Sequence, residues 1–219
     1  MIFMRSNNHQ AITAFYRRIL PLIFFILSLL LFVWIAHEVV LEQEDLFDSR
    51  AFGFFKAYSN PDYIPVFKAF TFLGSSTFLL GAYCILIVWL FIKKKKRDGI
   101  GFGLLGIAGF VLVYFLKLAF ARHRPGEPLL TALENYSFPS GHSVGSLLFF
   151  GILTWEIWQS AVSRKWKWAL TVLFVGTTLM VGVSRIVLRY HYASDVVGGF
   201  SLGLALLILF LFLLHIRKA

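Results

Sequence analysis

The strongest constraint on this chain is the recurrence of apolar runs, each of the length that a helix needs to cross a bilayer. A helix rises ~1.5 Å per residue, so about 20 residues reach across a hydrocarbon core of ~30 Å. Such runs cover residues 19–36, 76–92, 100–120, 142–161, 168–187 and 194–215. They predict an all-α, six-transmembrane-helix bundle. The second span can start earlier, because Tyr63–Phe72 is typical of an amphipathic helix that enters at Pro61 and leaves at Gly74.

Composition also favours a bilayer. Hydrophobic residues make up 58% of the 219 residues and charged residues only 15%, which is too apolar for a water-soluble globular protein. We expect residues 1–219 to form a single integral membrane domain. No small-residue cleavage site follows the first run, so we expect it to be an uncleaved span. The single cysteine, Cys84, excludes an intramolecular disulfide.

Basic residues collect on one side of the predicted bundle. With an even number of spans both termini share a side, and that side carries Arg5, Arg17, Arg18, the block Lys93–Arg97, Arg164, Lys165, Lys167, Arg217 and Lys218. The acidic cluster Glu42, Glu44, Asp45 and Asp48 falls on the other side. Lys and Arg concentrate in cytoplasmic loops, so both termini are expected to be cytoplasmic.

The basic block at 93–97 is short, lies between two spans and has no aromatic platform beside it. This arrangement argues against a nucleic-acid partner. The block is expected to be a topological anchor, and binding of anionic lipid headgroups is the alternative.

Polar residues gather at the other end of the later spans, where a simple membrane anchor would not keep them. The first cluster closes the third span with Lys117, Arg124 and Pro125. At ~100° per residue, Lys117 and Arg124 are expected to project from one face of a helix. Alternatively, both cations extend to the lipid headgroups without a further role.

The second cluster is the segment from Ser137 to His142 at the start of the fourth span. A Pro-Ser-Gly segment before a long apolar run predicts a loop that enters a helix N-terminus, where free N–H groups and the helix dipole favour an anion. Ser140 adds a hydroxyl, and Gly141 permits a close approach to the backbone. His142 is either a general acid or an ordinary interfacial histidine.

The third cluster contains Ser184, Arg185, His191 and Asp195. If the last helix begins as early as His191, the i, i+4 spacing lets Asp195 accept a hydrogen bond from one ring nitrogen. The other nitrogen would then be free as a nucleophile. Arg185 offers a planar fork suited to phosphate oxygens. The alternative is a purely structural His–Asp hydrogen bond.

Together the clusters provide cations, an anion-binding helix start and two histidines with an acidic partner. Phosphoryl transfer needs charge stabilisation on the equatorial oxygens, an in-line nucleophile and an acid for the leaving oxygen. The sequence therefore predicts a phosphate site in which Lys117, Arg124, Ser140, Gly141 and Arg185 bind the phosphate. In the same site His191 would be the nucleophile, Asp195 would orient it, and His142 would be the general acid.

The spacings Lys-x6-Arg-Pro at 117–125, Pro-Ser-Gly-His at 139–142 and Ser-Arg-x5-His-x3-Asp at 184–195 resemble the three-part signature of the type 2 phosphatidic acid phosphatase superfamily. No element of the signature is missing. The resemblance implies a phosphohistidine on His191, protonation of the leaving group by His142, and hydrolysis without metal or cofactor. The soluble haloperoxidases of that superfamily do not fit, because this chain has no soluble body.

Within the superfamily, the compact six-span layout is similar to bacterial phosphatidylglycerophosphate phosphatases of the B type and to undecaprenyl pyrophosphate phosphatases. The signature binds the phosphate that these lipids share, so it does not separate them. Specificity is expected in the loop 126–136 and in an apolar groove between spans, with Arg122, His123 and Arg189 either touching a headgroup or simply exposed. We expect a multi-pass protein of a bacterial plasma membrane whose partners are the bilayer and a lipid phosphate.

Two other classes of function compete with a phosphatase. A lipid transporter or scramblase could use the same cations, but the chain has few polar residues at membrane midplane and no evident inverted repeat. A catalytically silent lipid-binding protein would be expected to have lost a signature residue. The sequence does not indicate an oligomeric state.

Overall fold

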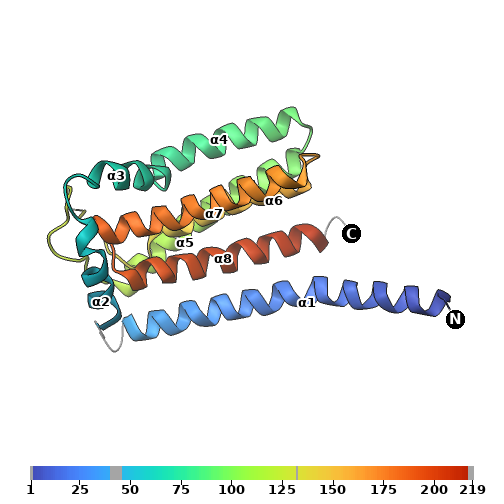
Figure 1. Ribbon diagram of the computed structural model, residues 1–219, viewed down its shortest axis with the longest axis horizontal. Coiled ribbons are helices and arrows are strands. Elements are labelled where there is room, and N and C mark those ends of the chain that lie inside the picture. The colour runs from blue at the N-terminus through green and yellow to red at the C-terminus, as the bar shows by residue number, and fades with distance from the viewer. Residues whose placement is uncertain (1, 40–45, 132, 217–219) are drawn as a thin grey trace.

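The computed structural model describes residues 2–39, 46–131 and 133–216, with side chains from residue 19 to residue 214 within these ranges. Every regular element in them is helical (Figure 1). In chain order the elements are α1 (Ile2–His37), α2 (Leu46–Phe55), the short 3-10 helix η2 (Lys56–Tyr58), α3 (Ile64–Leu73), α4 (Ser76–Ile92), α5 (Lys96–Phe120), α6 (Gly141–Gln159), α7 (Arg164–Val187) and α8 (Ala193–Ile216).

The expected apolar runs all form helices, but not all of them meet the requirements of a membrane span. Four helices are long and apolar enough among the described residues: Ile19–His37 of α1, and α5, α7 and α8. The pair α3 and α4, bent by 45° at their junction, makes a fifth. α6 occupies most of the expected run 142–161 but falls short of these requirements. It packs against α4, α5, α7 and α8, and these neighbours cover polar groups that it carries, such as the buried Glu156.

The junction of α3 and α4 lies where the sequence predicts it. α3 ends with Gly74 as its C-cap, and the side chain of Ser75 accepts a hydrogen bond from the Phe78 backbone N–H to cap α4. A Cβ on Gly74 would lie 2.5 Å from Val181 and 3.2 Å from His142. Glycine therefore allows this bend to rest directly on α6 and α7.

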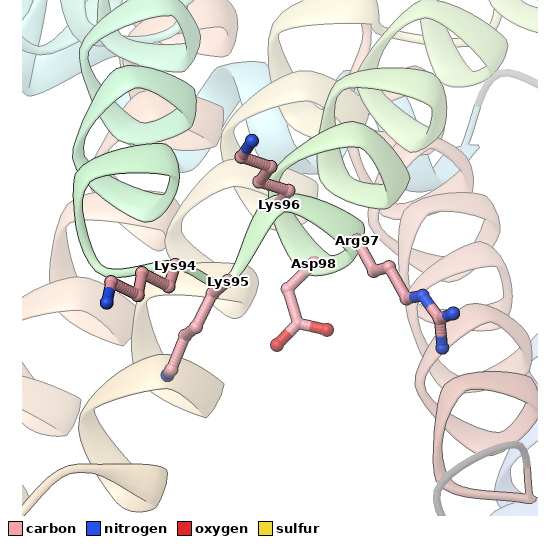
Figure 2. Close-up of a pocket in the computed structure, with 5 residues that line it drawn as sticks. All are labelled: Lys94, Lys95, Lys96, Arg97 and Asp98. Atoms are coloured by element: carbon pink, nitrogen blue, oxygen red, sulfur yellow. The ribbon is translucent and has the colours of Figure 1, made fainter.

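The bundle has two chemically different ends. α1 begins and α8 ends at one of them, together with the α4–α5 and α6–α7 turns (Figure 1). We call this the basic end, because the block Lys93–Arg97 lies there, in the α4–α5 turn and at the start of α5. The basic side chains of this turn splay apart around an open pocket of about 390 Å³ (Figure 2). The opposite end, formed by α2, α3 and the segments 121–140 and 188–192, we call the loop end.

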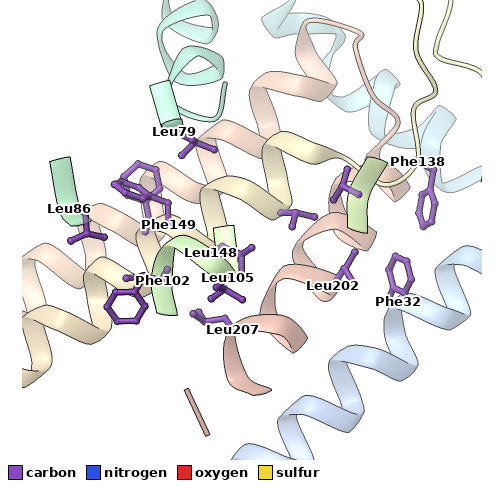
Figure 3. Close-up of a cluster of buried hydrophobic side chains, with 14 of the residues drawn as sticks. Phe32, Leu79, Leu86, Phe102, Leu105, Phe138, Leu148, Phe149, Leu202 and Leu207 are labelled. Carbon is purple, nitrogen blue, oxygen red and sulfur yellow. The ribbon is translucent and has the colours of Figure 1, made fainter. Parts of the chain in front are cut away.

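The main apolar core joins α1, α4, α5, α6 and α8 (Figure 3). Its part nearest the loop end is built around Phe138, which is fully buried. The Phe138 ring stacks on Phe32 of α1 with centroids 5.7 Å apart, and packs edge-on against Phe120 of α5 at 5.1 Å. Because Phe138 immediately precedes the Pro-Ser-Gly-His segment, this aromatic packing fixes the entry into α6 against the bundle.

Candidate active site

His191 and Asp195 meet in the short turn that joins α7 to α8. α8 begins only at Ala193, so the pair does not share a helix. The turn itself supplies the contact, because the His191 backbone N–H donates to the Arg185 carbonyl at 3.1 Å. The result is a distance of 3.2 Å between His191 Nδ1 and Asp195 Oδ2, and the Tyr192 N–H donates to the same oxygen at 2.9 Å.

The surroundings of the His191 imidazole favour its neutral form. The side chain is 2% exposed, and that of Asp195 is fully buried. Burial is the largest cause that lowers the pKa of His191 well below its usual 6.5, followed by the positive charges of the neighbouring cations Arg185, Lys117, Arg124 and Arg122. A carboxylate at Nδ1 favours a proton on that nitrogen, so Nε2 carries the lone pair. Nε2 lies 3.3 Å from Nη1 of Arg124.

The start of α6 lies beside this pair. Ser140 is the N-cap, its hydroxyl accepts from the Ser143 hydroxyl at 2.9 Å, and its N–H donates to the Asp195 carbonyl at 3.0 Å. His142 follows in the first turn, within electrostatic range of Arg185, His191, Arg124 and Lys117. The predicted second and third clusters are therefore adjacent in space.

The surrounding protein atoms leave room for a side chain at position 141. A Cβ there would meet only Val113, at an ordinary contact distance of 3.4 Å. By contrast, a Cβ on Gly199 of α8 would lie 2.8 Å from the Ser140 carbonyl oxygen. Packing thus explains the glycine at 199 but not the glycine at 141, which borders the space in front of the helix N-terminus.

The expected placement of Lys117 and Arg124 on one helical face is wrong. α5 ends at Phe120 because Ala121 adopts a left-handed conformation with φ of 47°, and Pro125 disfavours helix for the residue before it. Arg124 therefore lies in the following loop. The two cations still converge, since Lys117 Nζ and Arg124 Nη2 both donate to the Tyr136 carbonyl, at 2.5 and 3.3 Å.

Both cations are already bonded to the loop backbone. Lys117 also donates to the Ser137 carbonyl at 2.8 Å. Arg124 donates through Nε to the Asn135 carbonyl at 2.7 Å, through Nη2 to the Asn135 side chain, and through Nη1 to the Tyr190 carbonyl. Lys117 and Arg124 therefore hold the end of the loop 126–136 in place, a role that their sequence positions did not suggest.

Arg185, in the last turn of α7, has one side-chain donor that is not bonded within the described part of the chain. Its Nη1 donates to the Thr71 hydroxyl of α3 at 2.7 Å, and its guanidinium lies 4.2 Å from the centre of the Tyr190 ring. Its Nε is buried and has no hydrogen-bond partner within the described part of the chain. A buried guanidinium nitrogen without a partner is costly unless a ligand supplies one.

The sequence left the roles of Arg122, His123 and Arg189 open, and the structure separates them. His123 is exposed, and Arg189 pairs with Glu127 at the surface at 3.4 Å. Arg122 instead points inward and bridges two buried carboxylates, Asp195 and Asp48 of α2. Nothing in the sequence signals this last pairing, because Arg122 and Asp48 are 74 residues apart. Glu42, Glu44 and Asp45 lie outside the described residues.

These residues form a cationic site around a neutral imidazole. Four cations and two carboxylates leave a surplus of two positive charges, which suits a phosphate group carrying about −1.5 to −2. Within the described ranges no group of three or more His, Cys, Asp or Glu side chains is placed to hold a metal ion. A neutral, oriented imidazole beside the unpartnered Nε of Arg185 and the N–H donors of a helix start suits phosphoryl transfer.

Comparison with known proteins agrees with this chemistry. Residues 98–218 match the family model of the PAP2 superfamily. The chain is 32% identical over 145 residues to phosphatidylglycerophosphatase B of Bacillus subtilis, covering 66% of this chain and 71% of the relative. It is 33% identical over 137 residues to the undecaprenyl-diphosphatase BcrC of the same organism, covering 60% and 65%.

A solved structure extends the likeness to nearly the whole fold. The crystal structure of a transmembrane PAP2-type phosphatidylglycerolphosphate phosphatase from Bacillus subtilis aligns with a TM-score of 0.74 and 29% identity, over 90% of this chain and 96% of that one. The family match spans the elements that carry all three polar clusters. The chain therefore belongs to the PAP2 superfamily, as a multi-pass membrane lipid phosphatase.

Proposed function

We propose that this protein hydrolyses a lipid phosphate through a phosphohistidine intermediate on His191, without a metal ion. The observation that carries the proposal is the contact between His191 Nδ1 and the buried Asp195 carboxylate, which leaves Nε2 as an unprotonated nucleophile among cations. The unpartnered Nε of Arg185 supports a phosphate oxygen at the same place.

The reaction has two displacements at phosphorus. In the first, His191 Nε2 forms a P–N bond while the P–O bond to the lipid breaks, and His142 gives a proton to the leaving oxygen. In the second, His142 takes a proton from water, the water oxygen attacks phosphorus, and the P–N bond breaks to release inorganic phosphate. The bound phosphate offsets the nearby cations and so lets His142 carry its proton.

The phosphate oxygens would be bound by Arg185, by the first N–H groups of α6 and by the Ser140 hydroxyl. Gly141 leaves room for them at the helix start. Lys117 and Arg124 would join by exchanging part of their bonds to the loop carbonyls. Their charges act on the phosphate even before that exchange, because a buried site screens charge weakly.

Phosphatidylglycerophosphate is the substrate we favour, because phosphatidylglycerophosphatase B of Bacillus subtilis and the solved phosphatidylglycerolphosphate phosphatase share this fold and family. Undecaprenyl pyrophosphate is the alternative, on the similarity to the undecaprenyl-diphosphatase BcrC. An open, mostly apolar groove of about 850 Å³ between α4 and α6 supports a lipid in either case. It starts at Thr77 and Phe78, one turn beyond Gly74, where a Cβ would lie 3.2 Å from His142.

We further propose that the whole chain is one integral membrane domain of six spans, with α6 as the shielded span. The basic end would face the cytoplasm, which puts both termini there and the active site at the extracytoplasmic face. Support for this orientation comes from the Lys and Arg residues in and just after the α4–α5 turn and at the start of α7, which lie at the end where α1 begins.

The test is phosphate release by detergent-purified protein in the presence of EDTA. Phosphatidylglycerophosphate, phosphatidic acid and undecaprenyl pyrophosphate are compared for the wild type, His191→Gln and His142→Ala. We expect release that survives chelation, is lost in His191→Gln, and is fastest with phosphatidylglycerophosphate. His142→Ala should lose less activity on substrates with good leaving groups, since these need less protonation.

Each element of the proposal can fail separately. Full activity in His191→Gln would overturn the nucleophile, and loss of wild-type activity in EDTA would overturn metal independence. Equal losses across leaving groups in His142→Ala would contradict the acid role. A preference for undecaprenyl pyrophosphate would select the alternative substrate, and no release from any lipid would favour a transporter or a silent lipid-binding protein.

A further inference from the structure

Asp48 is a buried carboxylate in the first turn of α2, outside the region that matches the family model. Its side chain is 1% exposed and accepts three hydrogen bonds. Two come from Ser194 of α8, through the backbone N–H at 2.8 Å and the hydroxyl at 2.7 Å. The third comes from Arg122 Nη2 at 2.8 Å. Asp48 thus links the start of α8 to the loop that follows α5.

Arg122 connects Asp48 with the predicted catalytic pair. While Nη2 is held by Asp48, Nη1 donates to Asp195 Oδ1 at 2.6 Å and to the Ser194 hydroxyl at 2.8 Å. The guanidinium also lies over the Tyr192 ring, 4.0 Å from its centre. A planar fork held at both nitrogens and on one face has little freedom to turn.

The two oxygens of Asp195 have separate partners. Oδ1 accepts from Arg122 at 2.6 Å and, at a longer 3.5 Å, from the Ser137 hydroxyl, whereas Oδ2 accepts from the Tyr192 N–H and faces His191 Nδ1. Arg122 makes the shorter bond to Oδ1 and so restricts the rotation of the carboxylate, which in turn directs the imidazole. The chain of contacts runs from Asp48 through Arg122 and Asp195 to His191.

We propose that Asp48 is a positioning residue for phosphoryl transfer, acting through Arg122 on Asp195 and His191. The inference rests on the proposed function, since it presupposes that His191 is the nucleophile. Asp48 keeps one guanidinium nitrogen away from Asp195. Without this hold, both nitrogens of Arg122 can turn to Asp195, which draws Oδ2 away from His191 and lets the imidazole rotate.

A merely structural role for Asp48 would be the attachment of α2 to the first turn of α8, where Ser194 offers a free N–H. Asp48→Asn separates the two roles. The amide oxygen can still accept from the Ser194 N–H, which preserves the attachment to the helix start, but the NH2 group in place of Oδ2 cannot accept from Arg122 or from the Ser194 hydroxyl. The variant is therefore expected to keep the helix attachment and lose the hold on Arg122.

The experiment compares Asp48→Asn with Asp62→Asn, an exposed aspartate in the segment before α3, in detergent micelles with phosphatidylglycerophosphate. We expect kcat to fall about tenfold to a hundredfold, as for partners that orient a metal-binding histidine. KM should stay within about twofold, because Asp48 does not touch the phosphate. Asp62→Asn should match the wild type. Unchanged kcat in Asp48→Asn, or a rise in KM alone, would overturn the proposal.

A double-mutant cycle with Arg122→Gln tests the route of the effect. If Asp48 acts through Arg122, adding Asp48→Asn to Arg122→Gln should lower kcat by less than about twofold more. Independent, multiplicative losses would overturn that route. If Asp48→Asn yields no folded protein, Arg122→Lys replaces it, since an ammonium cannot bridge both carboxylates. The same selective loss of kcat is then expected, and an unchanged kcat overturns the proposal.

His191→Gln in the same assay distinguishes this inference from the proposed function. Activity in His191→Gln would overturn the nucleophile and the positioning role together. An inactive His191→Gln beside a fully active Asp48→Asn would overturn the positioning role alone.

Discussion

Both ends of the bundle contain a buried carboxylate that pairs with a cation, but the two pairings are built differently. At the loop end, Arg122 joins two carboxylates, and Asp195 and Asp48 have partners for both oxygens. At the basic end, Lys95 pairs with Glu156 of α6 at 2.7 Å. Lys95 is 39% exposed, and the second oxygen of Glu156 is buried with no hydrogen-bond partner among the described residues.

The difference indicates what each end requires. A fully bonded network fixes side-chain angles, which an active site needs because its groups must stay aligned. The partly exposed Lys95–Glu156 pair joins the α4–α5 turn to α6 but holds only one carboxylate oxygen. Changes at the loop end should therefore affect activity more than stability, and changes at the basic end should do the reverse.

The largest effect is expected from Arg185→Lys. Lysine cannot bond Thr71 and a phosphate oxygen through two planar nitrogens, so kcat/KM should fall about 10²- to 10³-fold with little change in melting temperature. Steady-state kinetics and thermal unfolding measure the two quantities. Arg164→Lys, at an exposed position of the basic end, is the control. A loss below about tenfold in Arg185→Lys would contradict its assignment to the phosphate.

A smaller loss is expected from Gly141→Ala. The new methyl group fits beside Val113 but enters the space assigned to the phosphate, so kcat/KM should fall about tenfold to a hundredfold in a folded protein. Gly199→Ala is the contrasting variant, because its methyl group would push on the Ser140 backbone and lower the melting temperature. Full activity in Gly141→Ala would place the phosphate elsewhere.

At the basic end, Lys95→Ala should reduce stability without reducing activity. It leaves the Glu156 carboxylate buried and unpaired, but because Lys95 is partly exposed the cost should be about 1–2 kcal/mol, below the ~3–5 kcal/mol of a fully buried pair. Thermal unfolding should show a lower melting temperature, recovered by adding Glu156→Gln. A loss of kcat at unchanged melting temperature in Lys95→Ala would contradict the expected difference between the two ends.

The smallest effect is expected from lowering the pH, which should leave His191 unprotonated. Since burial and cations lower its pKa, the imidazole should stay neutral as the pH falls through about 6.5. The unfolded chain takes up a proton there, so stability should decrease below that pH. Nitrogen NMR of histidine-labelled protein, with the His191 signal identified by its absence in His191→Gln, measures the charge. A protonated signal at pH 6.5 would contradict the site electrostatics.

Much of the fold was predictable, because apolar runs report helices directly. The bend at Gly74 and the helix start at Ser140 followed from local signals, namely a glycine after an amphipathic run and a Ser-Gly pair before an apolar one. The shielded position of α6 did not follow, because which helix the others surround depends on packing between distant segments.

The candidate site was predictable in its composition but not in its connections. The three spacings identified the residues that the loop end brings together. The placement of Arg124 on the helix face of Lys117 was wrong, because a left-handed alanine that ends the helix before Arg124 has no sequence signal comparable to glycine. Asp48 and Thr71 were missed because single polar residues in short helices are common, and their partners lie 74 and 114 residues away.

The bonds from Lys117 and Arg124 to the loop carbonyls also bear on product release. An anion entering the site gains from these two cations only the difference between its own hydrogen bonds and those it displaces. When inorganic phosphate departs, the two cations can donate hydrogen bonds to the same carbonyls again. Inhibition by accumulated phosphate should therefore be weaker than four nearby cations would suggest, which favours rapid turnover over tight binding.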